Sequence, residues 1–123
     1  MSTIRIGIVG LGANTRLRHI PGLLACDDVQ LHGVCNRTTK TTKRASVEYG
    51  IPQHYEQWQD LVADPDVDAV LIGTWPYMHC PITLAALQAG KHVLTEARMA
   101  MNSTEANQMF AASQARPDQV TQI

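Results

Sequence analysis

Six residues near the N-terminus, Gly10-Leu11-Gly12-Ala13-Asn14-Thr15, have the types and spacing of a turn that binds a pyrophosphate. In such a turn the first glycine permits a tight bend, the second lets the backbone approach the anion, and the third position allows close helix–strand contact. Amide N–H groups at the start of the following helix bind the negative charge. The third position here is Thr15, so the fingerprint is incomplete. A dinucleotide-binding turn is still favoured over an ordinary strand-to-helix turn.

The end of the second apolar run carries Asn36-Arg37-Thr38, and Lys40, Lys43 and Arg44 follow. NAD enzymes place an acid about 20 residues beyond the glycine turn to accept hydrogen bonds from the ribose 2′-OH. Asn36 does not repel a 2′-phosphate, Arg37 can pair with it and Thr38 can donate to it. NADP(H) is therefore the expected cofactor, with NAD(H) as the alternative.

Two other nucleotide-binding classes fit the sequence less well. A P-loop needs Gly-Lys-Ser/Thr after the turn, and these residues do not follow Gly12. A methyltransferase would want an acid at the end of the second strand to hold the ribose, and Asn36 occupies that place.

The third group of interest is the stretch "GKHVLTEARMA", residues 90–100, in which a short apolar strand ends at Glu96. In open α/β sheets, ligands bind beyond the carboxyl ends of the strands. Glu96 is therefore expected at the edge of the sheet that carries the glycine turn. Ala97 and Arg98 follow it directly.

Strand and helix patterns alternate along the chain and would position these groups. Strands are predicted over 3–10, 29–36, 67–74, 91–96 and 118–123, and helices over 15–28, 38–51, 55–66, 79–90 and 102–115. The first helix has Leu17, Ile20, Leu23 and Leu24 at helical spacing, with Pro21-Gly22 as an interruption. Gly50 and Gly90 are predicted C-caps, and Asn102 or Ser103 the N-cap of the last helix.

This order predicts an α/β fold, a doubly wound parallel sheet of the Rossmann type, as one dinucleotide-binding domain over residues 1–123. The last predicted strand stops half-formed. We therefore expect the natural chain to continue, with a complete small domain as the alternative.

Composition narrows the class of protein. The 123 residues are 45% hydrophobic, and the net charge of −1 divides into +5 for residues 1–44 and −6 for the rest. A local basic face favours a small anionic ligand over nucleic acid. The three cysteines lack C-x-x-C spacing, no run is long enough to span a membrane, and Met1-Ser2-Thr3 leads directly into a strand. A cytoplasmic protein without a structural metal is expected.

The residues resemble the Gfo/Idh/MocA oxidoreductase family, the group of glucose–fructose oxidoreductase and inositol dehydrogenase. "IRIGIVGLG" is similar to its first strand and turn, and "DPDVDAVLIGT" to its D-x-x-V-D-A-V-x-I-x-T segment. "TWPYMHCPITLAALQAGKHVLTE" resembles its T-P-N-x-x-H…A-L-x-x-G-K-H-V-x-x-E-K-P signature. The resemblance implies hydride-transfer chemistry on a sugar-like substrate, a second α+β domain after this one, and often a dimer. It also implies that Thr74, Trp75, Pro76 and His79 line the cofactor near the nicotinamide ribose, with Glu96 at the nicotinamide end. Arg98, at the place of the family's Pro, is also predicted to bind the cofactor.

Two departures from the signature affect the expected chemistry. The Asn of T-P-N is replaced within Thr74-Trp75-Pro76-Tyr77, and the Lys and Pro of Glu-Lys-Pro are Ala97 and Arg98. In the family that Lys is given a role in substrate binding and proton transfer. Alanine cannot donate a proton, and arginine is a poor general acid–base. No catalytic residue is assigned, the isolated chain is expected to be inactive, and a non-catalytic dinucleotide-binding or sensor protein is the alternative.

The remaining polar and sulfur-containing side chains carry no functional prediction. His19, His32 and His54 are interpreted as structural or exposed, and no His/Cys/Asp group has metal spacing. Met99, Met101 and Met109 are interpreted as core packing.

Overall fold

The structure of the chain is a computed structural model that describes residues 3–123. Met1 and Ser2, which are part of the predicted direct lead into the first strand, lie outside the described residues. Within the described range, no helix is both long and apolar enough to cross a membrane.

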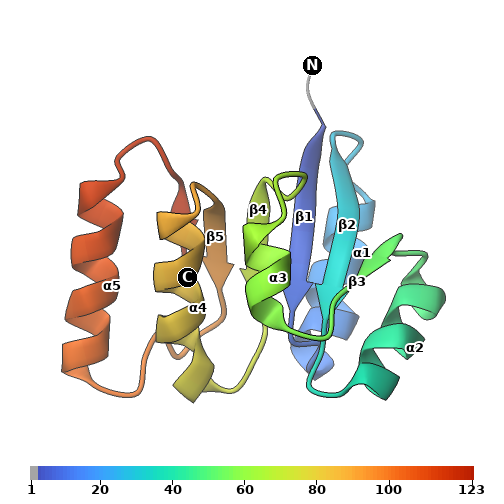
Figure 1. The fold of residues 1–123 in the computed structure, drawn as a ribbon, viewed down its shortest axis with the longest axis horizontal. Coiled ribbons are helices and arrows are strands. Elements are labelled where there is room, and N and C mark those ends of the chain that lie inside the picture. The colour runs from blue at the N-terminus through green and yellow to red at the C-terminus, as the bar shows by residue number, and fades with distance from the viewer. Residues whose placement is uncertain (1–2) are drawn as a thin grey trace.

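Strands and helices alternate in the predicted order (Figure 1). The strands are β1 (Ile4–Val9), β2 (Val29–Cys35), β3 (Gln53–His54), β4 (Ala69–Ile72), β5 (His92–Thr95) and β6 (Thr121–Gln122). The helices are α1 (Ile20–Leu24), α2 (Thr39–Tyr49), α3 (Trp58–Ala63), α4 (His79–Gln88) and α5 (Ser103–Ala115), with a π-helical turn η1 (Thr15–His19) and a 3-10 turn η2 (Pro76–Met78).

The strands form one parallel sheet in the order β3-β2-β1-β4-β5-β6. The order reverses between β1 and β4, which makes their carboxyl ends the topological switch point where ligands bind in such sheets. This is the strand order of dinucleotide-binding α/β folds, so the predicted fold class is confirmed.

Two apolar layers hold the helices against the sheet. Alternate residues of β1 face opposite sides, so that Ile8 packs with Ile20 of α1 and Ala45 of α2, while Val9 packs with the other layer. That second layer includes Leu61 of α3 and Ile82 of α4. In Figure 1, α3 and α4 lie in front of the sheet and α1 behind it. Both faces are covered, as the continuously apolar strands predict.

The first helix differs from the prediction at its proline. Pro21 does not interrupt the helix but lies in the first turn of α1, directly after the π turn, in which the N–H of Ile20 donates to the carbonyl of Thr15. Proline has no N–H, so a bond of the helical ladder is missing here and the wider turn accommodates it. The extra residue changes the phase of the apolar pattern. Ile20 is consequently buried, whereas Leu17 and Leu24 are exposed.

Other local predictions have mixed outcomes. Leu61 and Val62 of α3 are buried, and Asn102 rather than Ser103 caps α5 by accepting a hydrogen bond from the N–H of Glu105. The two-residue strand β3 was not predicted, because Gln53 and His54 are both exposed and show no apolar alternation. Met101 is exposed and is not part of the core, so that prediction was wrong.

Lys91 is an unexpected buried charge. Its side chain lies at the amino end of β5, and its Nζ donates to the carbonyls of Asp64 and Val67 at 2.7 and 2.6 Å. These bonds hold the loop between α3 and β4, which also contains Asp68, an ion-pair partner of Arg5 at 3.1 Å. The Gly-Lys pair of the signature thus has a structural role away from the glycine turn.

Candidate functional site

Four strands end at one edge of the sheet, and each delivers a polar residue or glycine there. The ladder continues one residue beyond β1, β4 and β5. The N–H of Gly10 donates to Cys35, that of Gly73 to Val9 and that of Glu96 to Ile72, at 2.9, 2.8 and 3.2 Å. Gly10, Asn36, Gly73 and Glu96 each directly follow a strand and therefore lie along the carboxyl edge of the sheet.

Two glycines allow the loops after β1 and β4 to touch. Gly10 has φ of +85°, and a Cβ there would lie 2.8 Å from backbone atoms of Gly73 and Thr74. A Cβ on Gly73 would lie 2.7 Å from the carbonyl oxygen of Gly10 and would also overlap the hydroxyl of Thr15. The first glycine thus serves both the turn and a close approach. Gly73 serves the close approach alone, and sequence reasoning missed it because no turn motif marks the position.

Thr15 explains why the third fingerprint position is not glycine. It is completely buried, and its hydroxyl donates to Oε1 of Glu96 at 3.2 Å. Threonine therefore supplies a hydrogen bond between the first helical turn and the end of β5. Thr15, which makes the fingerprint incomplete, and Glu96, the acid that follows β5, are therefore hydrogen-bond partners.

Two more side chains of the first helical segment reach the same oxygen. Nδ2 of Asn14 donates to Oε1 of Glu96 at 3.3 Å, and Nε2 of His19 lies 3.1 Å from it. The carboxylate is 18% exposed. His19, interpreted from sequence as structural or exposed, belongs to this site. Its position four residues after Thr15 on one helical segment is the signal that could have found it.

The end of β2 joins the glycine turn through Asn36. Its Oδ1 accepts from the backbone N–H of Leu11 at 3.2 Å, so its amide NH₂ remains available as a donor. A carboxylate at this place would offer acceptors only. Arg37 and Thr38 are exposed beyond it, and Thr38 caps α2 in a reciprocal pair with Thr41. The chemistry of this corner suits an anion better than a ribose hydroxyl.

His79 lies beneath the site. Its ring is 1% exposed, with Nδ1 2.7 Å from the carbonyl oxygen of Arg98 and Nε2 2.9 Å from that of Thr74. Both ring nitrogens are occupied, so the ring connects the loops after β4 and β5. His79 thus supports the loops after β4 and β5, and its implied place in the cofactor lining stays a prediction.

The other predicted residues lie around the edge. Gly12, Ala13 and Asn14 are exposed in the turn, with a Cβ on Gly12 meeting only ordinary contacts. Trp75 is 65% exposed at the start of η2, between the half-buried Thr74 and Pro76. Ala97 and Arg98 are exposed after Glu96.

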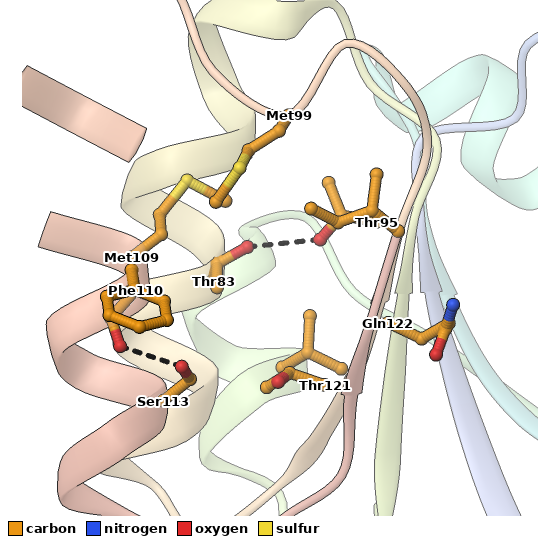
Figure 2. Close-up of a pocket in the computed structure, with 10 residues that line it drawn as sticks. Thr83, Thr95, Met99, Met109, Phe110, Ser113, Thr121 and Gln122 are labelled. Carbon is orange, nitrogen blue, oxygen red and sulfur yellow. Dashed lines mark hydrogen bonds between the residues drawn. The ribbon is translucent and has the colours of Figure 1, made fainter. Parts of the chain in front are cut away.

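A cavity of about 280 Å³ lies on the α5 side of β5 (Figure 2). Met99 and Met109 reach toward each other across it, and the hydroxyls of Thr83 and Thr95 are joined at 3.2 Å. None of its lining residues carries a charged side chain. It therefore offers no cationic side chain to a dinucleotide phosphate.

The fold brings together one group that the spacing along the chain conceals. Candidate ligand atoms of His32, Asp64 and Asp66 lie within 4.8 Å of one another. Their carboxylates already have donors, since Tyr55 donates to Asp64 and Arg5 to Asp66. The hydrogen bond from Tyr55 and the N–H of Asp66 lower the pKa of Asp64. The group is a structural network at the opposite end of the sheet from the glycine turn.

Comparison with known proteins identifies the family to which the chain belongs. The family model described as an oxidoreductase family with an NAD-binding Rossmann fold matches residues 4–122. The chain belongs to the Gfo/Idh/MocA oxidoreductase family. The match covers every strand and helix given above, including the four strand ends that form the site.

Relatives and solved structures agree with the family assignment. A 1,5-anhydro-D-fructose reductase of Ensifer adhaerens is 34% identical over 104 residues, which cover 84% of this chain and 31% of that protein. The myo-inositol 2-dehydrogenase of Lactobacillus plantarum superposes with a TM-score of 0.90 at 25% identity, over 98% of this chain and 36% of that one. A 3-ketoreductase of Actinomadura kijaniata, solved with NADP and TDP-benzene, gives 0.85 at 29% identity, over 94% and 35%. The chain thus spans about a third of the length of these family members.

Proposed function

We propose that this chain is the NADP(H)-binding domain of an oxidoreductase that transfers hydride between a nicotinamide cofactor and a sugar, polyol or related hydroxyl or carbonyl substrate. The observation that carries the proposal is the convergence of Gly10, Asn36, Gly73 and Glu96 at the switch point of the sheet. Family membership and the sugar- and inositol-directed relatives support the reaction class.

The residues at this edge fit a dinucleotide. The first helical segment starts beside Gly12, where its free N–H groups suit a pyrophosphate. The free NH₂ of Asn36, with Arg37 and Thr38 after it, suits a phosphate on the adenosine ribose. Glu96, fixed by donors from the first helical segment, is an acceptor at the nicotinamide end.

The division of chemical roles follows from the residue types. A bound nicotinamide would accept or supply the hydride. The accompanying proton needs a separate carrier, and Ala97 has no side-chain group that can carry it. We therefore assign substrate binding and proton transfer to a second α+β domain of the complete protein. The complete protein would act in the cytoplasm. It would form a homo-oligomer if the dimer contact of the family is present.

The test is turnover by the complete gene product. NADPH oxidation with keto-sugars, and NADP⁺ reduction with polyols and sugars, should be measurable by absorbance at the nicotinamide band. The isolated chain should bind dinucleotide without turnover. If the complete protein binds NADPH but is inactive across these substrates, the reaction class is wrong.

The second candidate is a non-catalytic dinucleotide sensor, which Ala97 favours. In that case Ala97→Lys would leave the complete protein inactive. An enzyme whose missing group is only this lysine would gain activity from the same substitution.

A further inference from the structure

A small cavity lies between the glycine turn, the end of β2 and α2. Its volume is about 90 Å³, and Leu11, Asn36, Arg16, Arg44 and Glu48 are among the residues that line it. A water occupies about 30 Å³ of liquid volume, so the cavity could hold only a few waters. A phosphate group is small enough for a space of this size, whereas a whole nucleotide is not. The adenosine ribose of a dinucleotide binds where the glycine turn meets the end of the second strand. Leu11 and Asn36 therefore place the cavity beside that ribose.

Arg16 reaches the cavity from the π turn. Its Nε donates to the hydroxyl of Tyr49 at 3.2 Å, and one terminal nitrogen lies 3.6 Å from Oε1 of Glu48. Both charged side chains of this pair are about half exposed, so the contact contributes little and can rearrange. The guanidinium is thus held at the cavity wall with donors to spare.

Arg44 approaches from α2, one helical turn before Glu48. It is exposed, and no ion pair involving it is found among residues 3–123. Arg37, by contrast, is exposed beyond the end of β2 and does not line the cavity. With the NH₂ of Asn36, the two lining guanidiniums form a set of donors contributed by three elements around one space.

The charge of this lining selects the ligand. Two arginines and one glutamate line the cavity, so the lining has one excess positive charge in the absence of ligand. A ribose hydroxyl would not use that charge, whereas a phosphate accepts several charge-assisted hydrogen bonds from arginine forks. The carboxylate of Glu48 repels a phosphate to the extent that Arg16 does not neutralise it.

We infer that Arg16 and Arg44 bind the 2′-phosphate of NADP(H) in this cavity, and that Glu48 is the resident anion that the phosphate replaces on Arg16. The inference rests on the proposed dinucleotide site and identifies the residues that set its preference for NADP(H). Arg37 then makes the smaller contribution, from the rim.

The test compares two fragments that differ by the phosphate, 2′,5′-ADP and 5′-AMP, titrated calorimetrically against the chain and its variants. Arg44→Gln and Arg16→Gln should each weaken 2′,5′-ADP at least tenfold and change 5′-AMP less than twofold. Glu48→Gln should tighten 2′,5′-ADP several-fold. Lys43→Gln is the matched control, because it removes the same charge from an exposed neighbour of Arg44 that does not line the cavity.

The outcomes separate this inference from the proposed function. If the chain binds NADPH and NADH but Arg44→Gln changes 2′,5′-ADP affinity no more than Lys43→Gln does, the inference fails and the dinucleotide site remains. Loss of 5′-AMP binding in parallel with 2′,5′-ADP would also overturn it. Binding of neither dinucleotide to the unmodified chain removes the proposed function and the inference together. Arg44 is exposed, so its variant should retain the native circular dichroism spectrum even if the Arg16 variant does not.

Discussion

The Glu96 carboxylate holds the first helical segment against the end of β5, since Asn14, Thr15 and His19 all contact its Oε1 atom. A single acid thus connects residues more than 75 positions apart. The contact needs Thr15 where glycine is usual, and it needs a glycine at position 73 to leave room for Thr15. At the scale of residues, the site depends on these matched sizes as well as on its polar groups.

Gly73→Ala tests the matched sizes. Its methyl group would overlap the Gly10 carbonyl and the Thr15 hydroxyl, and overpacking of this kind costs about 1–3 kcal/mol. We expect the free energy of unfolding, measured with urea, to fall by that amount. Gly22→Ala is the control, because nothing lies within 4 Å of a Cβ at that helical position and alanine should stabilise it slightly. Equal stability of the two variants would disprove the close approach.

Lys91→Met tests the buried lysine. The change retains most of the aliphatic stem but leaves the carbonyls of Asp64 and Val67 without their donor. We expect a loss of roughly 2–3 kcal/mol in the free energy of unfolding, as for hydrogen bonds from charged groups. The exposed Lys43→Met should change it by less than about 0.5 kcal/mol. A Lys91 variant as stable as the control would contradict a structural role.

At the scale of elements, local pattern was enough to predict most of the fold. Four of the strands are apolar runs with clear ends. Gly50 caps α2 with a positive φ, as predicted, whereas the cap of α4 is Ala89 and Gly90 follows it with a positive φ. The π turn was not predictable in this way. The helix has to accommodate Pro21 while Thr15 and His19 both contact Glu96. That second condition is a tertiary contact, which local sequence pattern does not show.

The residues of the site also fall into those that local pattern could predict and those that depend on tertiary contacts. Gly10, Asn36 and Glu96 could be predicted as one edge because parallel strands end together. His19, Gly73 and the Arg16–Glu48 pair could not, because each matters through a partner between 32 and 77 positions away that no local pattern indicates.

Asn102→Ala tests the cap of α5. The Asn102 side chain accepts from the N–H of Glu105 at 2.9 Å, and loss of such a cap costs about 1 kcal/mol. Thermal unfolding followed by circular dichroism should show a lower midpoint for this variant. Ser103→Ala, one residue further along, should have little effect. A larger drop in the unfolding midpoint for Ser103→Ala than for Asn102→Ala would contradict Asn102 as the N-cap.

At the scale of the whole molecule, the two ends of the sheet differ in how their charged side chains are partnered. The glycine-turn end carries Arg16, Arg37 and Arg44, while Asp64 and Asp68 lie at the other end with their donors. The Arg5 side chain lowers the pKa of Asp68 by hydrogen bonding, as Tyr55 does for Asp64. The acidic end therefore stabilises the fold while the basic end remains available for a ligand.

Stability should consequently fall in acid. Both carboxyl groups have a folded-state pKa below the ordinary value of 3.8, so their contribution is complete above that value and is lost as the pH falls through the folded pKa values. Urea unfolding between pH 7 and pH 2 should show a smaller decline for Asp64→Asn than for the unmodified chain. Asp118→Asn, which removes an exposed carboxylate, should decline as the unmodified chain does. Identical profiles for all three would exclude this source of acid sensitivity.

The central claim is that the row of strand ends from Gly10 to Glu96 binds a dinucleotide and prefers its 2′-phosphorylated form. Calorimetric titration of NADPH and NADH against the purified chain tests it most directly. We predict saturable one-to-one binding of both, with NADPH at least tenfold tighter. Tighter binding of NADH would contradict the phosphate preference, and binding of neither would contradict the site itself.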